Sequence, residues 1–418
     1  MIAKIYGNAV SGDIHAPSSK SCIHRHLICS SLCHEETELH LTELSNDIAA
    51  TCGCIRALGA GIFPKDGGLL IFPPESVNTS AVFNCVESGS TLRFMLPVAG
   101  ALGCEGLFTG SGRLPLRPID TLMETMTKNG AVFSSETLPF TLSGRLRSGK
   151  YFLPGNISSQ FVSGLLMALP LLAGNSEIIL TSPLQSSAYV DMTLKIMGDY
   201  SVYAEKKGSS FHIKGGQSYV SPGNIAPEGD WSSSAVLLAA GALGGTASVS
   251  GLSLQSLQPD RAILRILEKM GAYVSFSRGC ACVSRRELHA LELDISETPD
   301  LVSVLAVLAA NAVGKSVLYN GRRLRYKETD RLITTAEMIN ALGGCAKALN
   351  DSLEIYGTGL SGGAVSSFDD HRIAMAAALG GLTSSGRVEI SDAQVAAKSY
   401  PNFFDDLKAL GLKTELYE

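Results

Sequence analysis

Residues 122–133 read LMETMTKNGAVF and contain a complete change from helix to strand. Apolar residues recur three and four positions apart up to Lys128, which is the spacing of one helix face. Gly130 ends this run, because glycine adopts the left-handed conformation that closes a helix without steric cost. Residues 131–133 are then typical of a strand. The segment predicts a helix, a glycine stop and a strand in immediate succession.

This pattern of helix, glycine and strand occurs six times along the chain. Successive glycines are 71, 68, 73, 72 and 68 residues apart, at Gly59, Gly130, Gly198, Gly271, Gly343 and Gly411. Polar clusters that each open a long apolar run form a second series. They are spaced by 70, 69, 73, 68 and 71 residues and begin at Ser19, Gly89, Ser158, Trp231, Pro299 and Asp370. Two independent markers with one period indicate six copies of one supersecondary unit.

The apolar runs of the second series are typical of buried helices. Residues 163–172 and 234–240, for example, are apolar nearly all round, which is the pattern of a helix with no solvent-facing side. Each repeat is therefore predicted to be an α/β unit with one buried and one half-exposed helix. A buried helix leaves mainly its N-terminal end to meet water or a ligand.

Composition is that of a compact protein without a membrane span. The 418 residues leave room for two or three domains of ~150 residues, and the hydrophobic content is 45%. No apolar stretch reaches the ~20 residues of a spanning helix, and residues 1–6 alternate like a strand rather than a signal peptide. We expect a cytoplasmic protein. Its net charge of −5 argues against a nucleic-acid partner.

The ten cysteines are interpreted as structural thiols. Their spacings, such as the C-x-C pairs at 52–54 and 280–282, match no paired C-x-x-C zinc site. Free cysteine is a common small core residue, and a reducing compartment would keep it free. We expect no metal site.

Charged and hydroxyl side chains gather at the six predicted starts of the buried helices. These clusters are residues 19–21 with Arg25, 89–93, 158–160, 230–234, 298–300 and 369–372. Helix capping alone accounts for Ser, Thr and Asp at such positions, and we favour it for residues 230–234. Capping fails for the first cluster, because Lys20 and Arg25 are unfavourable at the positive end of a helix dipole. An anion held there by backbone N–H groups and both cations would explain them.

Three further charged clusters lie outside the helix starts, at residues 113–118, 326–331 and 397–401. Solvated surface charge explains any one of them about as well as a function does. Together they supply many Lys and Arg residues to an otherwise acidic chain. That abundance indicates a ligand with several negative charges, such as phosphates and carboxylates.

With these clusters in view, the chain resembles the 5-enolpyruvylshikimate-3-phosphate synthase family of enolpyruvyl transferases. The resemblance runs from end to end through seven motifs in order. They are residues 17–21 (PSSKS), 87–93 (ESGSTLR), 117–118 (RP), 158–160 (SSQ), 327–331 (KETDR), 370–372 (DHR) and 397–398 (AK). Seven short motifs in the right order are strong evidence, although any one of them is weak.

The resemblance implies an α/β fold of two domains, each with three repeats, with buried parallel helices and sheets that face solvent. Residues 16–227 would form one domain, mainly on the shikimate 3-phosphate side. Residues 1–15 and 228–418 would form the other, with the catalytic carboxylates and the arginines, Arg331 and Arg372, that clamp the phosphoenolpyruvate carboxylate. The active site would lie in the cleft between the domains. The chain would cross between them near residues 15–20 and 227–230.

The family reaction transfers the enolpyruvyl group of phosphoenolpyruvate to the 5-hydroxyl of shikimate 3-phosphate and releases phosphate, in chorismate and aromatic amino acid biosynthesis. It uses no metal and no organic cofactor, so charge stabilisation and proton transfer fall to side chains. We expect a monomer whose partners are these two small molecules.

Site residues follow from the motifs of the resemblance. Those expected to bind shikimate 3-phosphate are Lys20, Ser21, Arg25, Ser158, Ser159, Gln160, Ser186, Tyr189, Asp300 and Lys327. Those expected to bind phosphoenolpyruvate are Lys20, Gly89, Arg117, Gln160, Arg331, Arg372 and Lys398. Asp300 is the expected base for the 5-hydroxyl. Glu328, together with Lys20, is the expected acid for the methylene carbon, and the sequence leaves open which of the two delivers the proton.

Three residues depart from the family pattern. Ser18 stands where glycine is common, Glu87 where asparagine is frequent, and Arg323 where some members place an asparagine that contacts substrate. Gly89 itself is kept. It lacks a Cβ, and we expect this to leave room beside a bound ligand.

Two other classes of protein share part of this pattern. The sister transferase that acts on UDP-N-acetylglucosamine has the same repeats, but it usually carries a reactive cysteine before its Arg-Pro pair. Residues 109–117 contain none. A ring-shaped scaffold or DNA clamp requires Lys and Arg side chains along the helix faces that line the ring, whereas this chain places them at helix ends.

Overall fold

The structure, a computed structural model, describes residues 1–7 and 9–418. The chain divides into two compact units. Residues 19–227 form one of them, here called the continuous unit, and residues 1–18 with 228–418 form the other, here called the split unit. The first boundary therefore falls within residues 15–20, and the second follows residue 227.

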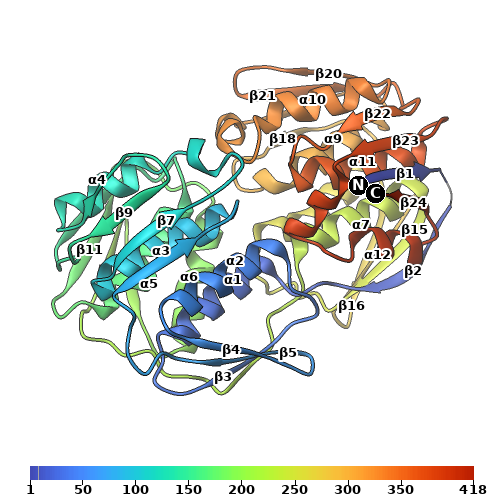
Figure 1. Cartoon of the computed structure of the whole chain (residues 1–418). Coiled ribbons are helices and arrows are strands. Elements are labelled where there is room, and N and C mark those ends of the chain that lie inside the picture. The colour runs from blue at the N-terminus through green and yellow to red at the C-terminus, as the bar shows by residue number, and fades with distance from the viewer. Residues whose placement is uncertain (8) are drawn as a thin grey trace. The chain divides into compact units, whose positions relative to one another are not determined.

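Six helices are buried over almost their whole length, as the apolar runs predict. They are α1 (Lys20–Ser31), α3 (Gly89–Leu102), α5 (Ser159–Ala168), α7 (Trp231–Gly244), α9 (Val302–Ala310) and α11 (His371–Thr383). In the continuous unit α3 packs against α5, and in the split unit α11 packs against α7 and α9. Figure 1 shows α3 beside α5.

Each buried helix is followed by an outer helix that leads to the next strand pair. The outer helices are α2 (Asn46–Ala57), α4 (Asp120–Lys128), α6 (Ser187–Asp199), α8 (Ile263–Met270), α10 (Arg331–Ala341) and α12 (Phe403–Ala409). Short 3₁₀ turns lie at η1 (Leu114–Leu116), η2 (Leu169–Leu171), η3 (Pro259–Ala262), η4 (Pro299–Leu301), η5 (Arg322–Tyr326) and η6 (Ala393–Lys398).

Among the described residues the strands form six four-stranded sheets, one for each repeat. Three belong to the continuous unit. Their orders are β14-β3-β5-β4, β6-β7-β9-β8 and β10-β11-β13-β12. The strands are β3 (Thr37–His40), β4 (Gly61–Lys65), β5 (Gly68–Phe72), β6 (Ser80–Asn84), β7 (Glu105–Thr109), β8 (Val132–Phe133), β9 (Phe140–Ser143), β10 (Lys150–Leu153), β11 (Ser176–Leu180), β12 (Ala204–Lys207), β13 (Ser210–Ile213) and β14 (Asn224–Ile225).

The other three sheets belong to the split unit, and two of them require the N-terminal residues. Their orders are β16-β17-β15-β2, β18-β19-β21-β20 and β22-β23-β1-β24. The strands are β1 (Ile2–Tyr6), β2 (Val10–His15), β15 (Gly245–Ser250), β16 (Tyr273–Ser277), β17 (Cys280–Ser284), β18 (Glu292–Asp294), β19 (Lys315–Tyr319), β20 (Cys345–Ala348), β21 (Ser352–Tyr356), β22 (Gly363–Ser366), β23 (Val388–Ser391) and β24 (Lys413–Tyr417). Because β1 pairs with both β23 and β24, the first residues complete the last repeat.

Every sheet has the same internal order, which confirms the sixfold repeat. In the sheet of β6–β9, for example, β6 runs parallel to β7, and β9 pairs antiparallel with both β7 and β8. A parallel pair needs a long crossover connection, whereas an antiparallel pair can be joined by a tight turn. In four of the sheets that crossover contains the buried helix, namely α3, α5, α9 and α11. In the pairs β14–β3 and β2–β15 the two parallel strands come from distant parts of the chain instead.

The expected glycine stops are present in five of the six repeats. Left-handed backbone follows the outer helix at Gly59, Gly130, Gly271, Gly343 and Gly411. The expectation is wrong for Gly198, which lies inside α6. There the helix continues to Asp199, and Ser201 takes the left-handed conformation with φ of 60°.

The fourth helix start is a cap, as expected. The Asp230 carboxylate accepts a hydrogen bond of 2.7 Å from the backbone N–H of Ser233. The segment just before α7 is also fixed by Gln258, whose side-chain oxygen accepts from the backbone N–H of Trp231 at 2.9 Å. Its amide group donates to the Gly229 carbonyl at 2.8 Å.

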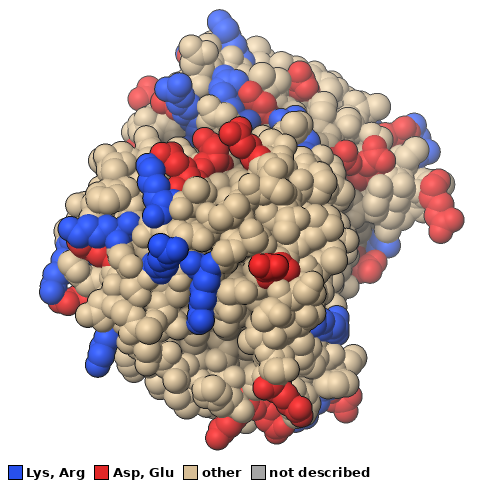
Figure 2. Space-filling view, turned by 60° about the vertical axis from the view of Figure 1, so that its left-hand side comes forward, with Lys and Arg blue, Asp and Glu red and all other residues tan. Residues whose placement is uncertain are grey.

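All ten cysteines are free, and seven of them are buried. Within residues 1–7 and 9–418, no three His, Cys, Asp or Glu side chains gather as a metal site would require. In the same described part of the chain, no helix combines the length and the apolar character needed to cross a membrane. On the face shown in Figure 2, basic and acidic side chains are both present and much of the surface is uncharged.

Gly198 and Gly271 predict stability changes of opposite sign on substitution by alanine. A Cβ at Gly198 would make only van der Waals contact, 3.6 Å from the Tyr203 ring, and alanine is favoured over glycine inside a helix by up to about 1 kcal/mol. A Cβ at Gly271, where φ is +106°, would lie 2.7 Å from the Glu287 carbonyl oxygen. We expect Gly198→Ala to raise the urea midpoint and Gly271→Ala to lower it. Midpoints that move in the same direction would contradict this assignment.

Candidate functional site

The continuous unit brings the N-terminal ends of α1, α2 and α3 together around Lys20. Its ammonium group donates a hydrogen bond of 2.7 Å to the Asp47 carboxylate in the first turn of α2. The N-cap residue Ser19 has no capping hydrogen bond, and its buried hydroxyl has no partner among the described residues. A helix start with a cation but without a cap is suited to an external anion.

Arg25 lies one turn deeper on α1 and is almost completely buried. It donates to the Thr193 hydroxyl at 2.7 Å and to the carbonyls of Ser21 and Tyr189 at 2.7 and 3.1 Å. Burial lowers its pKa to about 10. No carboxylate of the described residues forms an ion pair with it. Arg25 therefore ties Ser21 to Tyr189, and its charge has no acidic counterpart in the described part of the unit.

Gln160 is held in a fixed orientation at the start of α5. Its side-chain oxygen accepts from Arg93 at 2.8 Å, and its amide donates to the Ser90 hydroxyl at 2.7 Å. Arg93 also donates to the Pro118 carbonyl at 3.1 Å, next to Arg117. The ends of α3 and α5 and the 117–118 loop are thus joined through one guanidinium.

Gly89 lies directly against the guanidinium of Arg117. A Cβ at this glycine would lie 2.8 Å from both the Arg117 central carbon and one terminal nitrogen, which is closer than real contacts allow. We expected the missing Cβ to make room for a ligand. The structure shows a more specific reason, because the space beside Gly89 is occupied by Arg117.

The serine hydroxyls that are expected to bind shikimate 3-phosphate lie at two helix starts. Ser158 caps α5 by accepting from the Gln160 backbone N–H at 3.3 Å, and Ser159 follows it as the first residue of that helix. Ser186 precedes α6 in a left-handed conformation with φ of 53°. Such backbone is uncommon for a residue with a side chain and is concentrated at functional sites. Tyr189 lies in the first turn of the same helix.

In the split unit, the Arg331 guanidinium binds three carboxylates. It forks onto Asp370 with two hydrogen bonds of 2.9 and 3.2 Å. One terminal nitrogen donates to Asp300 at 2.9 Å and the other to Glu328 at 2.5 Å. Two of the three residues expected to act in catalysis, Asp300 and Glu328, are therefore fixed by one arginine whose side chain is 1% exposed. We expected Arg331 to bind a ligand carboxylate, but here protein carboxylates accept from four of its five N–H donors.

The neighbouring cations keep Asp300 ionised. Burial by itself raises the pKa of Asp300, but Lys327, Arg372 and Arg331 outweigh that effect and hold the pKa well below its usual range. The Lys327 ammonium lies 3.6 Å from the nearer Asp300 oxygen. Burial lowers the pKa of Lys327, and Asp300 offsets only part of the effect. A base that starts in its charged form can accept a proton without a preceding step.

Arg372 is a buried cation with unused donors. Its backbone N–H is capped by Asp370 at 2.9 Å, yet its side-chain Nε and Nη1 are buried and have no acceptor among the described residues. Lys398, from η6, donates to the Asp369 carbonyl at 2.8 Å. Leaving buried donors unsatisfied is costly, so Arg372 is a strong candidate to bind an anion.

Four residues outside the expected set organise these groups. Asp47 pairs with Lys20, Arg93 holds Gln160, and Asp370 anchors Arg331. Arg93 and Asp370 stand within the motifs at residues 87–93 and 370–372, so their charge was a usable signal. Asp260 is a fully buried carboxyl in η3, and no sequence pattern marks it. Arg323, the departure noted above, donates to the Ser296 carbonyl at 2.5 Å.

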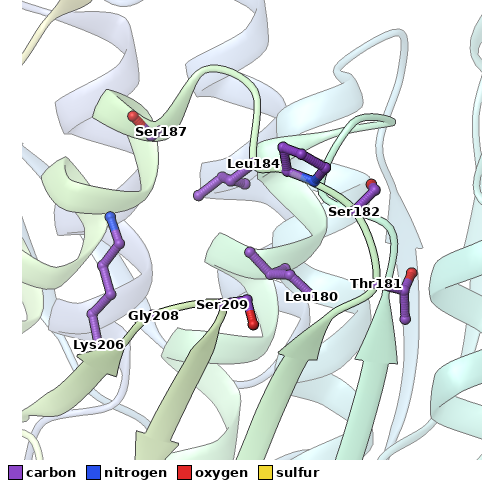
Figure 3. A pocket seen from close by; sticks show the side chains of 9 residues that line it. Leu180, Thr181, Ser182, Leu184, Ser187, Lys206, Gly208 and Ser209 are labelled. Carbon is purple, nitrogen blue, oxygen red and sulfur yellow. The ribbon is translucent and has the colours of Figure 1, made fainter.

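The pocket in Figure 3 does not contain the expected site. It has a volume of about 540 Å³ and lies in the continuous unit between the 180–187 segment and the turn that joins β12 to β13. Leu180, Leu184 and Lys206 are among its lining residues. None of the expected site residues lines it, although Ser187 is the neighbour of Ser186 in the chain.

Comparison with solved structures defines the class of fold. The chain superposes on EPSP synthase from Acinetobacter baumannii with a TM-score of 0.82 at 24% identity, covering 99% of each chain. It also matches the enolpyruvyl transferase NikO from Streptomyces tendae with a TM-score of 0.80 at 17% identity, covering 99% of this chain and 98% of that one. The fold is therefore that of the enolpyruvyl transferases, as expected.

Sequence comparison then identifies the family. The family model EPSP synthase (3-phosphoshikimate 1-carboxyvinyltransferase) matches residues 5–407. Proteins named 3-phosphoshikimate 1-carboxyvinyltransferase from Clostridium kluyveri and Clostridium acetobutylicum are both 40% identical to the chain. The matches cover 96% and 98% of this chain, and 95% and 97% of those proteins. The chain belongs to the EPSP synthase family.

Proposed function

We propose that this protein is a 3-phosphoshikimate 1-carboxyvinyltransferase. It transfers the enolpyruvyl group of phosphoenolpyruvate to the 5-hydroxyl of shikimate 3-phosphate and releases inorganic phosphate. Family membership supports this reaction over the UDP-N-acetylglucosamine alternative. The observation that carries the proposal is the Arg331 cluster, in which a base, an acid and two arginines are brought together in one buried place.

Shikimate 3-phosphate is proposed to bind the helix starts of the continuous unit and the carboxylate cluster of the split unit. Ser158, Ser159 and Ser186 would donate hydroxyl hydrogen bonds to its phosphate. Ser21 and Arg25 would bind its carboxylate, which supplies the negative charge that Arg25 lacks in the protein. Asp300 and Lys327 are then proposed to hold its ring hydroxyls, and Asp300 removes the proton of the 5-hydroxyl.

Phosphoenolpyruvate is proposed to bind among cations, because its phosphate and carboxylate are both anionic. Its contacts are assigned to Lys20, Gly89, Arg117, Gln160, Arg331, Arg372 and Lys398. The planar carboxylate fits a guanidinium fork, and Arg372 has two buried donors available for it. Arg331 would join in either through its one N–H that no protein carboxylate accepts or by exchange of Asp300 or Glu328 for the ligand on a terminal nitrogen.

This exchange on Arg331 has a chemical consequence. A carboxylate that loses a hydrogen bond from a guanidinium becomes more basic. Binding of phosphoenolpyruvate would thus raise the proton affinity of Asp300 or Glu328 at the moment when both substrates are present. The 5-oxygen then bonds to carbon 2 while the methylene carbon gains a proton from Glu328 or Lys20. Loss of phosphate and of one proton from that carbon restores the vinyl group.

We further propose that the protein works as a cytoplasmic monomer without a metal or an organic cofactor. Ten free thiols suit a reducing compartment. The assigned groups supply the acid, the base and the charge stabilisation that the reaction requires. Multi-angle light scattering measures the oligomeric state directly.

The reaction itself can be tested by a coupled assay of phosphate release. We expect release from phosphoenolpyruvate only when shikimate 3-phosphate is present, with an enolpyruvyl ether as the product by mass spectrometry. Phosphoenolpyruvate alone and phosphoenolpyruvate with UDP-N-acetylglucosamine serve as controls. Release with the sugar nucleotide, or equal release in all three mixtures, would refute the proposed function.

The roles of the two carboxylates predict a loss of turnover. Asp300→Asn removes the base and Glu328→Gln removes the acid, and each should lower kcat by roughly 10²-fold or more. KM for either substrate should change less than kcat. Asp369→Asn is the matched control, because it removes a neighbouring carboxylate that has no contact with Arg331. Near-normal kcat in either test variant would disprove the role assigned to that residue.

The contact between Gly89 and Arg117 predicts a binding defect without a folding defect. The methyl group of Gly89→Ala would displace the Arg117 guanidinium, which is the flexible end of a side chain and can move at little cost to stability. KM for phosphoenolpyruvate should rise, while KM for shikimate 3-phosphate and the melting temperature should change little. Equal increases in both KM values would show that Arg117 does not act selectively on phosphoenolpyruvate.

A further inference from the structure

Asp260 is a buried carboxyl for which the proposed reaction has no use. It lies in η3, immediately before α8, and its side chain is inaccessible to solvent. One of its oxygens accepts a hydrogen bond from the hydroxyl of Ser232 in the first turn of α7. The other oxygen is buried and has no partner among the described residues. A buried carboxylate with one hydrogen bond is expensive, so this position favours the neutral acid.

The charged groups whose electrostatic fields act on Asp260 come from three other elements. Asp230 caps α7, Asp300 lies in η4, and Arg372 lies in the first turn of α11. Burial and Asp300 are the main causes that raise the pKa of Asp260 to about 7, while Arg372 and the Ser232 hydroxyl act in the opposite direction. Arg261, in the same turn, points its guanidinium to the Leu254 carbonyl instead.

Asp260 and Asp300 therefore differ in how readily their carboxyl groups ionise. Two like charges in one buried region disfavour each other, and the carboxyl with the better cationic partners ionises first. Asp300 has Arg331 at 2.9 Å and Lys327 at 3.6 Å. Asp260 has no ion pair in the described part of the chain. Asp260 is consequently the first of the two carboxylates to take up a proton as the pH falls, while Asp300 stays available as a base.

Arg372 responds to the charge of Asp260. Its pKa is set first by burial, which lowers it, and then by Asp300, Asp260 and Asp230, which together raise it. Two of its nitrogens have no acceptor among the described residues, so these acids act on it through their field rather than through hydrogen bonds to those nitrogens. Ionisation of Asp260 adds a negative charge that competes with any anionic ligand for the same guanidinium.

We propose that Asp260 is a positioning residue for Arg372: as the neutral acid it leaves the guanidinium to an anionic ligand, and as the carboxylate it draws the guanidinium away. The proposal rests on the proposed function only in taking phosphoenolpyruvate as that ligand. It makes the affinity for this substrate depend on pH through a residue that does not touch it.

The sign of the effect follows from the ionisation of Asp260. As the pH rises through about 7, Asp260 becomes charged and KM for phosphoenolpyruvate should rise. The phosphate of the substrate titrates as well, with a second pKa of about 6 expected for a phosphate ester. That contribution is the same for every variant of the protein. The difference between variants therefore reports on Asp260 alone.

The experiment compares KM for phosphoenolpyruvate at pH 5.5 to 9 in the natural protein and in Asp260→Asn. We expect KM of the natural protein to rise relative to the variant by roughly fivefold to tenfold across pH 7, equivalent to about one pKa unit of interaction. The kcat ratio should stay nearly constant. Parallel KM profiles, or a uniform loss of kcat at every pH, would overturn the proposal.

Ser232→Ala is a second variant that moves the transition instead of removing it. Its hydroxyl favours the ionised form of Asp260, so its loss should shift the rise in KM to higher pH. Asp406→Asn is the matched control. Asp406 also accepts from a buried hydroxyl, that of Tyr400, and burial also raises its pKa, but Arg372 is not among the groups that act on it. A shift to lower pH with Ser232→Ala, or the same change with Asp406→Asn, would refute the role.

Two further readouts separate this proposal from the proposed function. Trp231 is the only tryptophan of the chain and precedes Ser232, so its fluorescence should titrate near pH 7 in the natural protein and not in Asp260→Asn. This measurement needs no substrate, and a titration unchanged by the substitution would count against Asp260. If Arg372→Lys leaves KM for phosphoenolpyruvate unchanged, the assigned role of Arg372 fails. If Arg372→Lys raises KM while Asp260→Asn does not alter the pH profile, only the role of Asp260 fails.

Discussion

Burial of six helices is the constraint on which the rest of the structure depends. A helix that is covered on all sides can expose only an end, and its N-terminal end carries unsatisfied N–H groups and a partial positive charge. Polar residues are therefore confined to those ends. Each unit of the chain repeats this arrangement three times, so a small number of positions receives nearly all of the chemistry. This explains why side chains such as Lys20 and Arg372, far apart in sequence, both lie in the first turn of a buried helix.

The two units use their helix ends differently. In the continuous unit, hydroxyl groups and backbone carbonyls surround Arg25, and this buried arginine has no ion pair with a described carboxylate. Gln160 is held there by the Arg93 guanidinium and the Ser90 hydroxyl. In the split unit, carboxylates surround Arg331 and balance its charge. The first environment is suited to bind an anionic substrate. The second is suited to hold acids and bases in defined protonation states until a ligand rearranges them.

The Arg331 cluster also shows how a buried charge network combines stability with reactivity. Breaking one partner of a buried ion pair costs about 3–5 kcal/mol, so the fork between Arg331 and Asp370 is a rigid anchor. Asp300 and Glu328 each accept only one hydrogen bond from the same guanidinium, so a ligand can replace them more easily than it can replace Asp370. Asp260, which is buried with one hydrogen bond and no ion pair in the described part of the chain, is the carboxyl proposed to titrate. A single site thus contains fixed, exchangeable and titratable carboxyl groups, distinguished by the number and charge of their partners.

The sequence by itself determined the sixfold repeat, the buried helices and the family, because periodicity and apolar content are properties of the chain that any reader can count. It also located most of the candidate site, since Lys, Arg and Asp at helix starts are unusual enough to need a reason. Tertiary structure alone decided the partners. That Arg117 fills the space beside Gly89 and that Arg331 binds Asp370 depend on contacts between separate segments of the folded chain. The continuation of α6 past Gly198 is likewise seen only in the structure. Asp260 left no pattern at all, because the burial and neighbouring charges that define it are created only when distant segments pack together.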